Sequence, residues 1–186
     1  MKIIETSLPG VLILEPKVFG DERGFFVETY REQVFAEAGL NVTFVQDNQS
    51  RSRRGVLRGL HYQLQQPQGK LVRVASGRVF DVAVDVRRGS PNFGQWTAAI
   101  LDDESHRQMY VPPGFAHGFA VVSEVADFVY KCTDYYHPQS EQGIRWDDPD
   151  IAIMWPQEIL GFLTIGEKDR QLPRLRQQSQ ERLPVF

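Results

Sequence analysis

The chain has 186 residues, of which 41% are hydrophobic and 24% charged, and its formal net charge is −3. This length predicts one domain spanning residues 1–186 with a large buried core, and the moderate charge argues against disorder. The negative net charge argues against a broad basic surface and therefore against nucleic-acid binding.

Neither membrane insertion nor secretion is predicted. Apolar runs such as Val11–Leu14 and Phe119–Val122 fall far short of the ~20 residues that span a bilayer. Glu5 and Pro9 interrupt the region where a signal peptide needs an unbroken apolar stretch. The only cysteine, Cys132, has no partner for an internal disulfide, which is typical of a reducing compartment. We therefore expect a cytoplasmic protein.

Short β-like runs, separated by turn-forming residues, make up most of the chain. In chain order they cover residues 11–14, 24–30, 42–46, 56–62, 70–76, 77–86, 94–101, 107–111, 114–122 and 127–132. Turn chemistry separates them, for example at Ser76-Gly77 and at Pro112-Pro113-Gly114. Strands and helices do not alternate, so the pattern predicts a sandwich or barrel rather than a parallel α/β sheet.

One helix is predicted after the second of these runs, over Tyr30–Ala38. Thr29 and Glu32 have the spacing of a capping box, and Gly39 can supply a left-handed terminus. The residues that would face the core are Val34, Phe35 and Ala38.

The clearest strand pattern lies in residues 77–86. One parity carries only apolar side chains, which predicts one fully apolar face: Phe80, Val82, Val84 and Val86. The other parity carries Val79, Asp81, Ala83 and Asp85. The segment after Pro156 is rich in glutamine and basic residues, and it is expected to form short helices or a mobile arm.

The histidines give no sign of a metal site. A β-barrel metalloenzyme needs a close pair such as His-x-His together with a carboxylate and a distant histidine. The four histidines, His61, His106, His117 and His137, all lie more than ten residues apart. We therefore expect no metal, although distant residues can converge in a fold.

His61 lies in the strand-like run VLRGLHYQ, where it shares parity with Leu57 and Gly59. If Leu57 points into a barrel, His61 is expected to point inward too. On residue pattern alone, the imidazole is either a hydrogen-bonded core histidine or a general base in a cavity. Two cations, Arg58 and Lys70, flank it along the chain.

Five segments together carry a family resemblance. They are FGDERGFFVETY, FVQDNQSRSRRGVLRGLHYQ, QGKLVRV, GRVFDVAVDVRRGSPNFGQW and YVPPGFAHGFAVVSEVADFVYKCTDYYHPQSEQGIRWDDPDIAIMWP. In this order they closely resemble the dTDP-4-dehydrorhamnose 3,5-epimerase family, from about residue 8 to residue 156. The resemblance implies an all-β, cupin-type double-stranded β-helix (jelly roll) with one short N-terminal helix and a short C-terminal helical or irregular tail. It also implies a homodimer that uses no metal or organic cofactor.

The resemblance assigns four catalytic residues. His61 in GLHYQ falls on the general base, and Tyr130 in FVYKC falls on the acid. Lys70 in QGK falls on the residue that stabilises an enolate. Asp169 in GEKD falls on the aspartate that orients the histidine.

The same resemblance implies a substrate-binding site in which Tyr136 stacks on thymine. Its residues are Arg23, Glu28, Gln46, Asn48, Arg58, His117, Tyr136, Glu141 and Lys168.

The substrate expected from the resemblance is a thymidine diphosphate-linked 4-keto-6-deoxyhexose. Its C4 ketone acidifies the hydrogens at C3 and C5, and inversion there needs a base and an acid on opposite sides of the ring. The expected reaction converts dTDP-4-keto-6-deoxyglucose into dTDP-4-keto-L-rhamnose. Three alternatives stay open at this point: an epimerase for C3 only, a non-catalytic barrel that binds nucleotide sugars, and a metal-dependent cupin.

Overall fold

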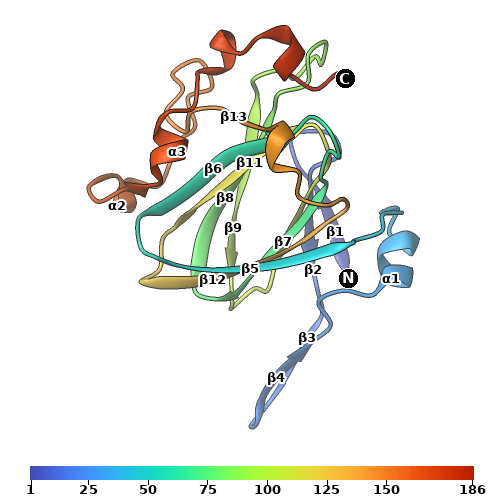
Figure 1. Ribbon diagram of the computed structural model, residues 1–186. Helices are drawn as coiled ribbons and strands as arrows, with labels where there is room; N and C mark the ends of the chain where they lie inside the picture. Colours follow the sequence, from blue (N-terminus) through green and yellow to red (C-terminus); the bar gives the residue numbers. More distant parts are fainter.

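The structure is a computed structural model that describes residues 1–186, and it consists mainly of β-strands (Figure 1). The strands are β1 Lys2–Glu5, β2 Leu12–Glu15, β3 Val18–Asp21, β4 Gly24–Val27, β5 Gln46–Arg53, β6 Val56–Gln63, β7 Lys70–Ser76, β8 Arg78–Asp85, β9 Trp96–Asp102, β10 Gln108–Val111, β11 Phe115–Val121, β12 Val125–Cys132, β13 Glu141–Gly143 and β14 Thr164–Ile165. The helices are α1 Glu32–Glu37, α2 Gln157–Leu160 and α3 Glu167–Arg170, with single 3₁₀ turns at Pro138–Ser140, Leu175–Gln177 and Gln180–Arg182. The predicted all-β fold class is confirmed.

Two sheets form the body of the molecule. The first has the strand order β1-β2-β10-β7-β12-β5, and the second has the order β13-β6-β11-β8-β9, with the short β14 parallel to β6. Neighbours within each path run antiparallel, and many are far apart in the sequence, as expected for a jelly roll. No helix has the length and apolar character needed to cross a bilayer.

The main core lies between the two sheets. Val72 on β7 and Phe128 on β12 come from the first sheet, whereas Ala83 on β8 and Phe119 on β11 come from the second. The rings of Phe119 and Phe128 stack with centroids 4.0 Å apart, which ties the sheets together at the middle of the sandwich.

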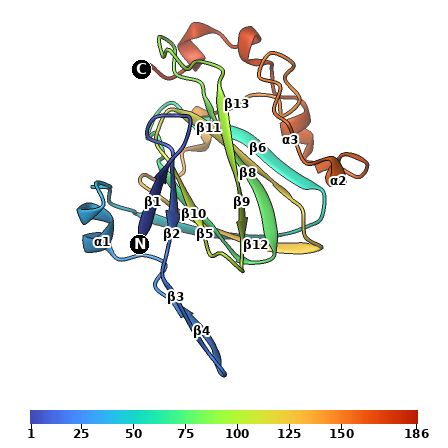
Figure 2. The ribbon, with the colours of Figure 1, turned by 180° about the vertical axis from the view of Figure 1, so that it is seen from behind.

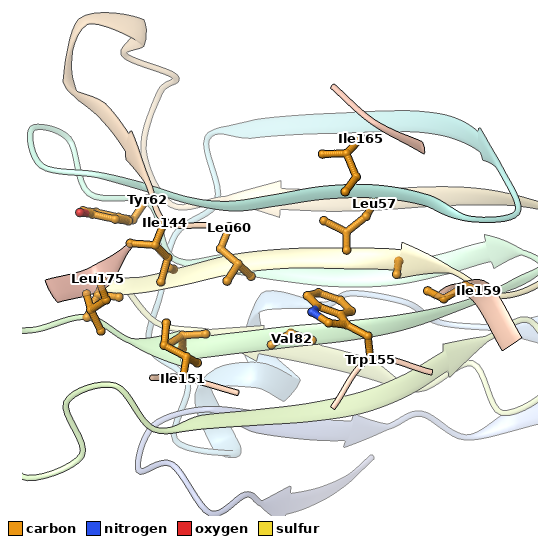
Figure 3. Close-up of a cluster of buried hydrophobic side chains, with 14 of the residues drawn as sticks. Leu57, Leu60, Tyr62, Val82, Ile144, Ile151, Trp155, Ile159, Ile165 and Leu175 are labelled. Carbon is orange, nitrogen blue, oxygen red and sulfur yellow. The ribbon is translucent and has the colours of Figure 1, made fainter. Parts of the chain in front are cut away.

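A second core covers the outer face of the second sheet (Figure 3). This sheet contributes Leu57, Leu60 and Val82. They pack against side chains from the C-terminal part of the chain, such as Trp155 and Ile159. The segment after Pro156 forms short helices and turns that lie along this face (Figure 2), so the expectation of short helices is confirmed.

The strand at 78–85 is buried more completely than its alternation predicts. Both of its faces are covered, because one contacts the inter-sheet core and the other contacts the C-terminal segment. Asp81 and Asp85 are therefore fully buried rather than solvated. The C-terminal segment provides the second cover of this strand. Its own sequence has no strand pattern from which this cover could be predicted.

The predicted helix is present but shorter. It covers Glu32–Glu37, and Arg31 at its N-cap makes no side-chain capping bond, so the predicted capping box is wrong. The backbone carbonyl of Thr29 instead accepts a hydrogen bond from Gln108 Nε2, 2.8 Å away, which holds this residue against the sheet. Gly39 has φ of +86° as expected, and Phe35 is the buried residue of the helix.

The predicted strand at 42–46 is also wrong, because the strand begins at Gln46 and runs through QDNQSRSR to Arg53. This segment, β5, has no apolar face and so gave no strand signal. Its four inward-facing residues are polar because they face the site described below: Gln46, Asn48, Ser50 and Ser52.

A hairpin of β3 and β4 stands off the body of the molecule (Figures 1 and 2). It exposes three phenylalanine rings, Phe19, Phe25 and Phe26, of which Phe26 is 68% exposed. An apolar surface of this kind on a projecting element is typical of a protein interface.

Candidate active site

Two adjacent cavities open between the sheets, with volumes of about 330 and 360 Å³. The predicted residues that line the first are Gln46, Asn48, His61, Lys70, Tyr130, Tyr136 and Glu141. Those that line the second are Arg58, His61, Lys70, His117, Tyr130 and Asp169. Three groups, His61, Lys70 and Tyr130, line both cavities and therefore stand at the junction.

A β-bulge in β6 sets which side chains reach the cavities. His61 pairs with His117 on β11, but Arg58 pairs with Phe119, so three steps on β6 match two on β11. The extra residue reverses the in-and-out alternation of β6. Arg58 and His61 therefore both face the cavities, although they are three residues apart.

The expectation that Leu57 and His61 share a face is wrong for the same reason. Leu57 lies in the outer core under the C-terminal segment, and His61 lies inside. Gly59, at the bulge, has φ of +122°, and a Cβ there would lie 2.6 Å from Gly118 Cα. Only glycine fits this conformation and this close approach.

Asp169 holds the imidazole of His61. Asp169 Oδ1 lies 2.7 Å from His61 Nε2, and its Oδ2 accepts a hydrogen bond of 3.1 Å from the backbone N–H of Gly59. Burial raises the pKa of Asp169, but the bonds from His61 and Gly59 outweigh it and hold the pKa below its usual value. Because this carboxylate accepts the Nε2 hydrogen, Nδ1 is the imidazole nitrogen left to take a proton.

Glu141 lies on the other side of the imidazole. Its Oε1 is 3.8 Å from His61 Nδ1, and its Oε2 accepts a 2.9 Å hydrogen bond from the Tyr136 hydroxyl and another from Lys168 Nζ. Burial raises the pKa of Glu141, but the bond from Lys168, the charge of His61 and the bond from Tyr136 bring it below the usual value. The imidazole is thus flanked by two carboxylates.

Tyr130 and Lys70 enter the site from the opposite sheet. They lie on neighbouring strands, β12 and β7, where Lys70 is paired with Cys132. Burial raises the pKa of Tyr130, so the phenol keeps its proton at neutral pH. Burial lowers the pKa of Lys70, against the opposing effects of nearby acidic groups that include Glu141. No protein group accepts a hydrogen bond from its amine, so this amine is free to meet a ligand.

The second cavity has a buried His–Asp pair that the sequence did not indicate as a pair. His117 Nε2 lies 3.0 Å from Asp81 Oδ1, and Asp81 is fully buried. Burial raises the pKa of Asp81, although His117 and Lys70 oppose that effect. One sequence feature could have indicated Asp81: its carboxylate lies on the same face of the predicted strand as the apolar Val79.

Polar side chains of β5 complete the cavity walls. Gln46 donates to Asn48 Oδ1 at 3.1 Å and accepts from the backbone N–H of Tyr136 at 2.8 Å. Arg58 donates to Ser52 Oγ through two nitrogens, each at 3.2 Å.

Arg23 and Glu28 do not join this site within the chain. Arg23 lies at the exposed end of the β3–β4 hairpin, where it pairs with Asp21 at 2.5 Å. Glu28 pairs with Arg31 at 3.1 Å. Neither side chain is among the residues that line the two cavities.

Comparison with known proteins identifies the family of this chain. The family model described as dTDP-4-dehydrorhamnose 3,5-epimerase matches residues 5–177. The chain belongs to the dTDP-4-dehydrorhamnose 3,5-epimerase family. A member from Pseudomonas aeruginosa is 58% identical over 92% of this chain and 94% of its own length.

Solved structures of this family share the fold. An epimerase from Legionella pneumophila in complex with dTDP-4-keto-L-rhamnose has a TM-score of 0.96 at 53% identity, covering 100% of this chain and 98% of its own. A 3'-monoepimerase from Streptomyces bikiniensis in complex with dTDP-quinovose has a TM-score of 0.89 at 34% identity, covering 97% of this chain and 91% of its own. The cupin-type jelly roll expected from the sequence is confirmed by these neighbours.

Asp169→Asn is expected to lower the free energy of unfolding by about 1 kcal/mol at pH 7, because Gly59 and His61 lose a charged acceptor. The pKa of Asp169 is lower in the folded state than in the unfolded state. Its contribution is therefore fully present above the unfolded pKa of about 3.9 and is lost as the pH falls through the folded value.

Urea unfolding of both proteins at pH 7 and at a series of pH values descending from about 4 measures this effect. The two free energies of unfolding should converge as the pH falls through the folded pKa of Asp169. Asp21→Asn is the control, because it removes an exposed ion pair and should change stability little at either pH. A difference between wild type and Asp169→Asn that persists undiminished in acid would contradict the charged pairing.

Proposed function

We propose that this protein inverts C3 and C5 of dTDP-4-keto-6-deoxyglucose to give dTDP-4-keto-L-rhamnose. One observation carries the proposal: His61 faces Tyr130 and Lys70 from opposing sheets across adjacent cavities. The similarity to an epimerase in complex with dTDP-4-keto-L-rhamnose supports it. Each step is a proton transfer, so no electrons move to or from a cofactor.

His61 is proposed as the base. Its Nδ1 removes the proton next to the C4 ketone, because Nε2 is engaged by Asp169. The imidazolium that forms lies between two carboxylates, Asp169 and Glu141, which stabilise its charge. A positioned base of this kind contributes about 10²–10⁴ in rate.

Tyr130 and Lys70 are proposed as acid and enolate stabiliser. Tyr130 keeps its proton because burial raises its pKa, and it lies on the sheet opposite to His61. It can therefore return a proton to the ring face that His61 does not reach. The amine of Lys70, which has no competing partner, donates to the developing enolate oxygen.

The remaining cavity residues are proposed to bind the nucleotide. Arg58 presents a guanidinium that suits a diphosphate, and Tyr136 presents an aromatic ring for stacking on thymine. Gln46 and Asn48 supply donors and acceptors along β5 in the first cavity, and His117 lines the second cavity together with Arg58. We also propose a cytoplasmic location, because the only cysteine, Cys132, is free and buried and a chain with one cysteine needs no oxidising compartment.

Deuterium exchange tests the proposed reaction. With substrate in deuterium oxide, wild type should place deuterium at both C3 and C5, read by NMR. Label at C3 alone would indicate a C3 epimerase, and no label despite bound nucleotide would indicate a non-catalytic binder; either outcome contradicts the proposal. His61→Ala should lose exchange at both carbons by at least about 10² and should still bind dTDP.

His106→Asn is the matched histidine control. His106 lies outside both cavities, where its ring contacts Phe25 with centroids 4.4 Å apart, and its left-handed φ of +52° is tolerated by asparagine. This variant keeps the proposed base and should therefore still exchange at both carbons. Retained exchange in His61→Ala would overturn the assignment of the base.

We also propose a homodimer in which each hairpin of β3 and β4 crosses to the other subunit. The exposed Phe19, Phe25 and Phe26 would then be covered. β5 is the open edge of the first sheet and carries Gln46 and Asn48, so a hairpin added to this edge brings Arg23 near the first cavity. Arg23 would then leave its ion pair with Asp21 and pair instead with the diphosphate of the substrate bound in the other subunit.

Subunit complementation tests this arrangement. Arg23→Ala and His61→Ala should each be defective alone, Arg23→Ala by about tenfold or more in kcat/KM because it loses a charged contact. When the two are co-expressed, half of the dimers are mixed and hold one intact site each, so activity should return to about a quarter of wild type. No recovery in verified mixed dimers would mean that Arg23 serves its own chain.

A further inference from the structure

Gln63 is a buried polar residue that the proposed chemistry does not use. It ends β6, two residues after His61, and is only 5% exposed. All of its polar atoms are engaged by the backbone of two loops. Nε2 donates to Gln66 O at 2.8 Å and to Tyr135 O at 3.2 Å, and Oε1 accepts from the backbone N–H of His137 at 3.0 Å.

The two loops bonded by Gln63 form one side of the first cavity. Residues 64–69 connect β6 to β7 and carry Gln68, and residues 133–140 follow β12 and carry Tyr136. Both Gln68 and Tyr136 line the first cavity. Neither loop contains a strand. Two backbone hydrogen bonds join the loops near their ends, from the N–H of Leu64 to Ser140 O at 3.2 Å and from the N–H of Thr133 to Gly69 O at 2.9 Å, and side-chain bonds fix the backbone between these points.

Further hydrogen bonds join the same two loops near their ends. Ser140 Oγ donates to Gln65 O at 3.0 Å, and Gln68 Nε2 donates to Asp134 O at 2.9 Å. The backbone N–H of Gly69 donates to Thr133 Oγ1 at 2.7 Å. Gln63 differs from these side chains because it bonds both loops from outside them, at the end of β6.

We propose that Gln63 is a positioning residue that holds the two loops together so that Tyr136 and Gln68 are preorganised for a nucleoside diphosphate. This inference rests on the proposed function, since it assigns the first cavity to the nucleotide. Without Gln63, three backbone groups lose their partner and the loops sample other positions. The nucleotide then has to order them, which weakens binding. The proton-transfer residues lie on strands and stay in place.

The test compares Gln63→Ala with Gln178→Ala. Gln178 is a matched buried glutamine, 8% exposed, whose Nε2 donates to the Tyr62 hydroxyl and to Gly143 O under the C-terminal segment. Gln63→Ala should weaken dTDP binding, measured by calorimetry, and raise KM by about tenfold or more, with kcat within about threefold of wild type. Gln178→Ala should lower Tm and leave dTDP binding and KM unchanged.

A double-mutant cycle separates positioning from general destabilisation. If Gln63 acts through Tyr136, then Gln63→Ala should cost much less dTDP affinity in a Tyr136→Ala background than in wild type. If Gln63→Ala does not fold, Ser140→Ala removes a bond between the same loops and should shift binding in the same direction.

Three results would overturn the inference. They are wild-type dTDP affinity in the folded variant, a loss confined to kcat, and full additivity with Tyr136→Ala. Failure of the proposed function is distinguishable, because wild type would then fail to bind dTDP or to exchange deuterium.

Discussion

The close contact between β6 and β11 at Gly59 and Gly118 is the constraint on which the site depends. At this contact β6 has one residue more than the matching stretch of β11. Arg58 and His61 therefore point to the same side, whereas Leu57 and Leu60 face the outer core. The bulge also points the backbone N–H of Gly59 at Asp169. One local irregularity therefore places Arg58, the proposed base His61 and the carboxylate of Asp169 that contacts it. A regular strand could not have placed both Arg58 and His61 inside.

The carboxylate of Glu141 lies between His61, the proposed general base, and Tyr136, the residue proposed to stack on thymine. Glu141 contacts the imidazole of His61 through one oxygen, and it accepts from Tyr136 and Lys168 through the other. Lys168 is the residue before Asp169 on α3, so one short helix positions groups on both sides of the imidazole. A single carboxylate thus connects Tyr136, the residue proposed to stack on thymine, with His61, the residue proposed to remove the proton.

Sequence patterns predicted those parts of the fold in which side-chain alternation follows burial. The strands around Val72 and Val82 were predicted from their apolar residues, whereas β5 was missed because its inner face is polar and lines the cavities. Gly59 is the only glycine within β6, and a glycine inside a strand often marks a bulge, but the residue order does not show that the in-and-out alternation reverses there. Motif resemblance named residues that the fold brings together around the cavities, but Arg23 lies on a projecting hairpin outside both cavities.

The most direct test of this account is Gly59→Ala against Gly161→Ala. A Cβ at Gly59 would meet Gly118 Cα at 2.6 Å and the carbonyl of His117 at 2.8 Å, whereas Gly161 has φ of −74° and open space around it. Gly59→Ala should lower the free energy of unfolding by about 2 kcal/mol or more and slow deuterium exchange strongly in the fraction that remains folded. Gly161→Ala should leave stability within about 1 kcal/mol and exchange unchanged. Wild-type exchange in a folded Gly59→Ala protein would contradict the claim that this bulge positions the base.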